Sequence, residues 1–192
     1  TLGLRRGLAA TLLMLALPGA AYLYQGEELG LPEHTTLPDD ARQDPTWFRS
    51  EGRERGRDGA RVPLPWTADA PSLGFGPGPA TWLPQPEEWA ALAVDRQTGD
   101  PRSTLELYRV ALRLRRELSL GSGTLTWQDI PPGTGAVRAE ATEAADATKA
   151  AEATPAATGR DGVPEAAAGV LAFRNGATLV LANLGLPPVP VP

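Results

Sequence analysis

The sequence contains no cysteine, one histidine and one lysine among its 192 residues. The absence of cysteine excludes disulfides, thiolate metal sites and cysteine nucleophiles. Because His34 is the only histidine, multi-histidine metal sites are excluded and a Ser-His-Asp triad would have to use it. His34 stands in the polar segment LPEHTTLPDD, which is typical of solvated surface. Nothing in the sequence therefore implies a metal or an organic cofactor.

Positive charge and long apolar runs are also scarce. Lys and Arg total 18 against 23 Asp and Glu, which gives a formal net charge of -5. An acidic chain has no electrostatic attraction for nucleic acid or an anionic membrane surface. The longest uninterrupted apolar run, residues 8–17, is far shorter than the roughly 20 residues of a membrane-spanning helix. We expect neither nucleic acid nor a membrane as a partner.

The N-terminal segment RRGLAATLLMLALPGAAYLYQGEELG is open to two interpretations. Two arginines before a short apolar stretch fit a secretory signal cleaved near Ala20. Alternatively, residues 3–17 form a buried helix closed by Pro18-Gly19, and residues 20–25 form a strand buried on both faces. A helix followed at once by such a strand is typical of an α/β fold with a parallel sheet. We favour this second interpretation and a cytoplasmic location.

The remaining segments predict a long loop, helices and a small antiparallel sheet. Residues 31–80 are rich in Pro, Gly and Arg, and residues 87–94 are a short helical candidate. Residues 103–119 predict a helix with a capping box formed by Ser103 and Glu106. Its expected apolar stripe is Leu107, Val110, Ala111, Leu114 and Leu118, and its expected solvated face is Arg113, Arg115 and Arg116.

Strands are expected at residues 124–129, 169–175 and 177–185, the last two joined by a turn at Asn175-Gly176. A six-residue Ala/Thr/Glu repeat at residues 139–156 lacks large apolar side chains. We therefore expect a mobile insertion at about 134–168.

Two groups of residues could carry chemistry. Glu27 and Glu28 follow the expected strand, at the end where parallel α/β proteins place their sites. Four arginines fall within nine residues, flanked by Trp47, Phe48 and Trp66. Their planar donors and the indole rings suit sugar hydroxyls and sugar faces, although a loop held by Arg–carboxylate pairs would look similar. These arginines are Arg53, Arg55, Arg57 and Arg61.

Four segments, in order along the chain, resemble the α-amylase family of glycoside hydrolases (family 13). The stretch LPGAAYLYQGEELGL is similar to the family's strand-eight pattern G-x-P-x-I-Y-x-G-x-E, with Ala21 in place of the proline. YQGEELG and GRDGARVPLPW resemble motifs of the α-glucosidase and oligo-1,6-glucosidase branch, the latter its R-D-x-x-R-x-P-x-x-W. Residues 82–117 resemble that branch's W-L-P…N-V-x-x-Q…D-P-x-S signature, and VLAFRN…LVLANLG its C-terminal β domain.

The resemblance implies that residues 1–121 are the last part of a TIM (β/α)8 barrel, and that residues 122–192 are a small antiparallel β domain with the insertion. The family's three catalytic carboxylates and its N-H-D motif would then lie upstream of Thr1. The rest of the barrel would be required, and we expect this chain alone to be inactive. The parent enzyme is expected to be a retaining α-glucosidase that hydrolyses short α-linked gluco-oligosaccharides from the non-reducing end.

The resemblance also assigns roles to site residues. Arg57 would pair with an upstream aspartate and bind the far hydroxyls of the non-reducing-end glucose. Arg61 would reach the leaving-group side of the substrate or brace the loop. Gln25, Glu27 and Glu28 would lie at the active-site rim. Adjacent strand residues point to opposite faces, so we expect one of the glutamates to order the loop rather than both to form a catalytic pair.

Two alternatives stay open. The first is a sucrose or trehalose isomerase or a glucosyltransferase of the same superfamily. The second is a secreted, non-catalytic carbohydrate-binding module that would bind sugar through Trp47, Trp66 and Trp82.

Overall fold

The computed structural model describes residues 2–128 and 170–183, so the expected insertion at about 134–168 lies outside the described residues. The chain divides into two compact units. One is Tyr22–Leu114, and the other combines Thr1–Ala21 with Arg115–Pro192. Within the described residues, no helix has the length and apolarity needed to cross a membrane. The domain boundary expected at residue 121 stays a prediction.

In the second of these units, helix α1 (Leu2–Ala16) confirms the helix expected over residues 3–17. The expectation that this helix is buried is wrong, because Leu15 is its one buried residue and Leu2, Leu4 and Leu12 are 39–50% exposed. The C-terminal end of α1 is held by Arg115, whose guanidinium donates to the carbonyl oxygens of Leu15, Leu17 and Gly19. These carbonyls lie at and just beyond a helix end, where they lack intrahelical donors. The expectation that Arg115 belongs to a solvated face is therefore wrong, because Arg115 is half-buried and its guanidinium is bonded to these three backbone carbonyls.

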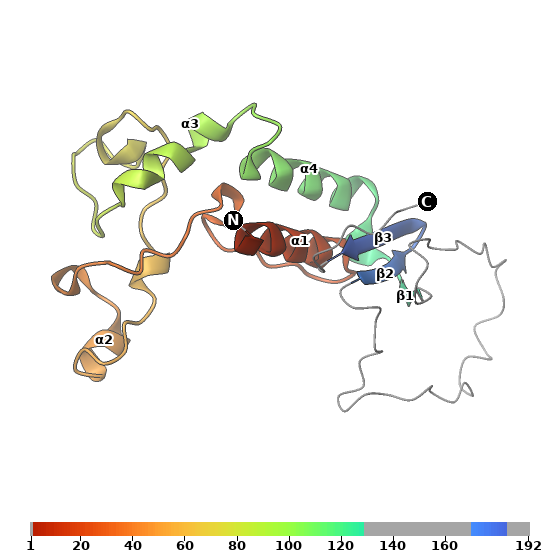
Figure 1. Ribbon diagram of the computed structural model, residues 1–192, viewed down its shortest axis with the longest axis horizontal. Coiled ribbons are helices and arrows are strands. Elements are labelled where there is room, and N and C mark those ends of the chain that lie inside the picture. Colours follow the sequence, from red (N-terminus) through yellow and green to blue (C-terminus); the bar gives the residue numbers. More distant parts are fainter. Residues whose placement is uncertain (1, 129–169, 184–192) are drawn as a thin grey trace. The chain divides into compact units, whose positions relative to one another are not determined.

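The same unit contains an antiparallel sheet in the order β1-β2-β3 (Figure 1). Its strands are β1 (Leu125–Trp127), β2 (Val170–Asn175) and β3 (Thr178–Asn183). The predicted hairpin is confirmed, but Asn175 pairs with Thr178, so the two turn residues are Gly176 and Ala177. The Asn175 side chain is buried and donates to the carbonyls of Ala16 and Leu120, both at 2.8 Å.

The unit Tyr22–Leu114 is built mainly from short helices and loops. It contains α2 (Pro45–Arg49) and α3 (Val94–Gln97), and α4 (Thr104–Glu117) runs past its boundary. The unit also has short 3-10 helices, which are η1 (Glu27–Leu29), η2 (Asp39–Ala41), η3 (Asp58–Ala60), η4 (Pro71–Gly74) and η5 (Glu87–Leu92). A further one, η6 (Leu120–Ser122), belongs to the other unit. The core cluster is Leu37, Val62, Leu83 and Trp89.

Helix α4 begins as the sequence predicts, with one change in its cap. The Ser103 hydroxyl accepts from the Glu106 amide at 3.2 Å, as a capping box requires. The Glu106 carboxylate accepts from the Gly99 amide at 3.0 Å instead of returning to Ser103. The buried side chains of α4 are Leu105 and Tyr108. Much of the expected apolar stripe stays exposed in this chain, including Val110, Leu114 and Leu118 at 39–49%.

The strand expected at residues 20–25 is not formed. Residues 20–24 have no regular secondary structure, and Tyr22 is 86% exposed rather than buried. A parallel strand needs neighbouring strands to pair with its backbone. Within the described residues, the only sheet is the antiparallel β1-β2-β3 sheet.

Candidate active-site loop

The carboxylate of Asp44 is the centre of the arginine-rich loop. Its Oδ1 accepts from the Thr46 amide at 2.9 Å, which makes Asp44 the N-cap of α2, with Pro45 next in the chain. Its Oδ2 accepts from the Arg57 amide at 2.9 Å and from Arg61 Nη1 at 3.0 Å. The amides of Thr46 and Arg57, with a smaller contribution from the Arg61 charge, lower the pKa of Asp44 to about 2. The ionised carboxylate thus joins α2 to both predicted substrate-binding arginines.

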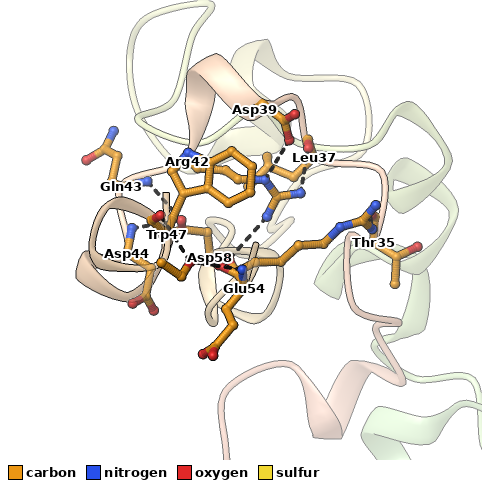
Figure 2. Close-up of polar contacts among 11 residues, drawn as sticks. Thr35, Leu37, Asp39, Arg42, Gln43, Asp44, Trp47, Glu54 and Asp58 are labelled. Carbon is orange, nitrogen blue, oxygen red and sulfur yellow. Dashed lines mark hydrogen bonds and ion pairs between the residues drawn. The ribbon is translucent and has the colours of Figure 1, made fainter. Parts of the chain in front are cut away.

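Asp58 makes the reciprocal connection. Its side chain is 1% exposed, and its Oδ2 accepts from the amides of Gln43 and Asp44, both at 2.8 Å (Figure 2). Gly56 allows the backbone to lie close to the Asp44 side chain, because its φ is +67° and an added Cβ would lie 2.5 Å from Asp44 Cγ. The segments 43–44 and 57–58 are therefore held together by two carboxylates, because Asp44 accepts from the backbone of Arg57 and Asp58 accepts from the backbone of Gln43 and Asp44.

The four arginines between residues 53 and 61 differ in whether their guanidinium groups are bonded. Three of them donate to protein oxygens, Arg53 to the Ser50 carbonyl, Arg55 to the Thr35 carbonyl and Arg61 to Asp44. Arg57 is exposed, and its guanidinium has no hydrogen-bond or ion-pair partner among the described residues. Its backbone amide, by contrast, is held by Asp44. The backbone of Arg57 is therefore held by Asp44, whereas its guanidinium is available to bind another group.

A further arginine, Arg42, is buried beside this loop, and no sequence pattern indicated it. Its Nε lies 3.1 Å from Asp39 Oδ1, its Nη2 donates to a backbone carbonyl at 2.8 Å, and its Cζ lies 5.1 Å from the ring centroid of Trp47 (Figure 2). This is the geometry of a cation–π contact. One face of Trp47 is thus covered, whereas Trp66 and Trp82 are 48% and 51% exposed.

The two glutamates of the expected rim bond to their own turn. Glu27 Oε1 accepts from the Tyr24 amide at 3.2 Å, and Glu28 Oε2 accepts from the Gly26 amide at 2.9 Å. Both residues lie in the 3-10 turn η1, and Gln25 just before it is exposed. Both carboxylates therefore make loop-ordering contacts, where the sequence led us to expect this of one.

Gln25 and Glu27 also line a small cavity of about 120 Å³, together with Gly59, Ala60 and Trp89 among others. This part of the expected rim thus lies beside the R-D-G-A-R segment. The other expected site residues do not line the cavity. Its volume is below the roughly 300–1,000 Å³ of ordinary ligand pockets, so the cavity alone is too small to hold a ligand of ordinary size.

Two sequence expectations concern His34 and metals. His34 is half-buried rather than fully solvated, and its backbone amide donates to the Gly59 carbonyl at 3.0 Å. Over residues 2–128 and 170–183, no three His, Asp or Glu side chains are grouped so as to hold a metal ion.

Asp44 is the site residue that sequence reasoning missed. A local signal for it exists, because an aspartate directly before proline is a typical N-cap of a helix that starts with proline. That signal predicts the bond to Thr46. The bonds to Arg57 and Arg61, 13 and 17 residues away, have no counterpart in a local pattern.

Comparison with known proteins supplies the family. A family model described as the α-amylase catalytic domain matches residues 4–123. Maltase A1 of Drosophila melanogaster is 34% identical over 134 residues, which cover 67% of this chain and 22% of the maltase. A probable α-glucosidase of Rhizobium meliloti (strain 1021) is 40% identical over 104 residues, which cover 54% of this chain and 18% of the α-glucosidase. The chain therefore spans about a fifth of the length of these curated relatives.

A solved structure gives the same result. The crystal structure of an α-glucosyl transfer enzyme, XgtA, is 31% identical and superposes with a TM-score of 0.63 over 93% of this chain and 27% of its own. The family match covers more than half of the chain and includes the loop that presents Arg57. The chain belongs to the α-amylase family of glycoside hydrolases, with residues 4–123 falling in its catalytic domain.

Proposed function

We propose that the protein carrying this chain is a retaining α-glucosidase, which releases glucose from the non-reducing end of short α-linked gluco-oligosaccharides. The names of the similar proteins, a maltase and a probable α-glucosidase, support this substrate class. In this proposal, residues 1–121 complete a (β/α)8 barrel, and the rest of the barrel supplies the nucleophilic and acid/base carboxylates. Apolar side chains of α4 and of residues 22–24 are exposed, and in this proposal they pack against the rest of the barrel.

The observation that carries the proposal is the free guanidinium of Arg57. A planar guanidinium can donate two parallel hydrogen bonds, which suits neighbouring hydroxyls of one sugar ring. Because the Arg57 backbone is held by Asp44, the head reaches substrate from a fixed base. Such a contact would hold the terminal glucose so that its anomeric carbon meets the nucleophile. It would also close the pocket and favour exo-action.

The neighbouring residues take supporting roles in this proposal. Arg61 braces the loop, since its guanidinium is bonded to Asp44, whose side chain is 8% exposed. Glu27 and Glu28 order the turn at the rim through their bonds to backbone amides. Gln25 lies at the same rim, exposed and beside the cavity shared with the R-D-G-A-R segment.

The test is Arg57→Ala in the full-length enzyme, assayed on maltose and isomaltose. Hydrogen bonds to a charged group contribute about 1.5–3 kcal/mol, so we expect kcat/KM to fall about 10- to 100-fold. Arg53→Ala is the matched control, because Arg53 belongs to the same loop but bonds to the Ser50 carbonyl. Unchanged hydrolysis by Arg57→Ala would contradict the proposal.

A second assay addresses the need for the rest of the barrel. We expect the isolated 192-residue chain to leave a chromogenic α-glucoside intact under conditions in which the full-length enzyme hydrolyses it. Measurable release of the chromophore by the chain alone would show that it carries its own catalytic groups.

Glucosyl transfer is a second candidate, favoured by the likeness to the α-glucosyl transfer enzyme at 31% identity. A hydrolase and a transferase would share the covalent glucosyl intermediate and differ in whether water or a sugar hydroxyl attacks it. Product analysis with excess maltose separates them. Glucose alone indicates hydrolysis, whereas trisaccharide formation indicates transfer.

A further inference from the structure

The bond between Asp44 and the Arg57 amide has a consequence for the site. Oδ2 of Asp44 holds Arg57 by its backbone and Arg61 by its side chain, while Oδ1 caps α2. Asp44 is 6% exposed and its own amide is fixed by Asp58, so the carboxylate has little freedom to move. The position of the Arg57 backbone therefore depends on the second oxygen of Asp44.

We infer that Asp44 is a positioning residue that orients Arg57 toward the sugar, and that it thereby determines recognition of the hydroxyls farthest from the scissile bond. The inference rests on the proposed function, because it requires Arg57 to bind the terminal glucose. Asp44 itself does not touch substrate. Its two oxygens are occupied by Thr46, Arg57 and Arg61, which leaves no oxygen without a protein donor.

The two oxygens of Asp44 allow capping and positioning to be separated. Serine is as good an N-cap as aspartate, so Asp44→Ser retains an acceptor for the Thr46 amide. It lacks the second oxygen, and with it the bonds to Arg57 and Arg61. Asp44→Asn is the isosteric second variant, which keeps the volume but replaces one acceptor by an NH₂ donor. If one of the two fails to fold, the other still tests the inference.

The measurement is the preference of the full-length enzyme for an aryl α-glucoside over its 4-deoxy analogue, expressed as the ratio of kcat/KM values. The C4 hydroxyl lies opposite the anomeric carbon, so it reports on contacts to the far side of the ring. A site that hydrogen-bonds a hydroxyl discriminates strongly against the analogue that lacks it. We expect Arg57→Ala to reduce the ratio about 10-fold or more, and Asp44→Ser to reduce it by a similar factor.

The matched control is Asp100→Asn. Asp100 also combines a backbone-amide bond with an arginine partner, both from Arg102, but it lies outside the loop. General destabilisation would lower activity on both substrates alike and leave the ratio unchanged. We expect the ratio of Asp100→Asn to equal that of the wild type. A reduced ratio in this control would overturn the assignment to Asp44.

Combining the variants decides whether Asp44 acts through Arg57. If it does, Asp44→Ser with Arg57→Ala lowers the ratio no further than Arg57→Ala alone, because residues that share one interaction are not additive. Full additivity, or an unchanged ratio in Asp44→Ser while Arg57→Ala reduces it, would overturn the inference. An unchanged ratio in Arg57→Ala would instead overturn the proposed function, so the two failures are distinguishable.

Discussion

Replacing Gln97 by leucine tests whether one buried amide holds the start of α4 to the turn that carries the expected rim. Gln97 Nε2 donates to the carbonyls of Leu29 and Leu92, at 3.0 and 2.8 Å, and Oε1 accepts from the Leu105 amide at 3.1 Å. The residue is 7% exposed. Leucine fills a similar volume, so the substitution removes three hydrogen bonds without opening a large cavity.

The magnitude follows from the burial of the three backbone groups. The bonds to Leu29 and Leu105 are buried, and each orphaned group there costs about 1–3 kcal/mol. The bond to Leu92 is partly buried, so water can replace it at a cost of about 0.5–1.5 kcal/mol. Burying leucine in place of the amide offsets about 1–2 kcal/mol. We expect the free energy of unfolding to fall by about 1–6 kcal/mol, measured by urea denaturation of the full-length protein.

Gln43→Leu is the matched control. Gln43 is exposed, and its side chain donates a hydrogen bond from Nε2 to the Trp82 carbonyl at 3.3 Å. A surface substitution of this kind changes stability by about 0.5 kcal/mol or less. Hydrogen exchange of the Leu105 amide adds a local readout, which should accelerate in Gln97→Leu only. Equal stability losses in the two variants would refute the reasoning, because burial would then not matter.

Two further predictions concern the Asp44 carboxylate. In Gly56→Ala, a Cβ 2.5 Å from Asp44 Cγ and a φ of +67° should reduce stability by about 2–4 kcal/mol in urea unfolding, whereas Gly78→Ala, which adds a Cβ in open space, should be neutral. Equal effects would show that the contact is not rigid. The lowered pKa of Asp44, about 2 against an ordinary 3.8, means that the folded state gains stability above pH 3.8 and loses it as the pH falls toward 2. The urea midpoint of the wild type should therefore fall more steeply than that of Asp44→Asn between pH 5 and 2, and parallel curves would contradict this.

The elements that the sequence predicted well are those defined by neighbouring residues. Helix α1 ends just before Pro18, and Ser103 caps α4, because both signals act within one helical turn. The hairpin β2–β3 follows from alternating apolar residues and a glycine with a φ of +58° at position 176. Local chemistry determines these features.

The features that the sequence did not reveal depend on contacts between distant residues. Gln97 reaches a carbonyl 68 residues away, and Asn175 reaches one 159 residues away. In each case a side-chain amide satisfies backbone groups at the end of another element. The identity of the acceptor depends on the tertiary fold, because any exposed helix or turn end presents the same carbonyl. The strand expected at residues 20–25 illustrates the same dependence, since a parallel strand requires neighbouring strands, and the only sheet among the described residues is the antiparallel β1-β2-β3 sheet.

The arginine-rich loop shows why composition could not decide between its two interpretations. A sugar-binding surface and a loop held by Arg–carboxylate pairs require the same residues, and the structure contains the basis of both. Arg42 and Arg61 pair with Asp39 and Asp44, while the head of Arg57 is left unbonded among the described residues. The bonds of these arginines confine the loop backbone from which the Arg57 side chain projects. If Arg57 binds a sugar as proposed, a rigid backbone reduces the conformational entropy that is lost on binding, and the structural pairs then contribute to affinity without touching the ligand.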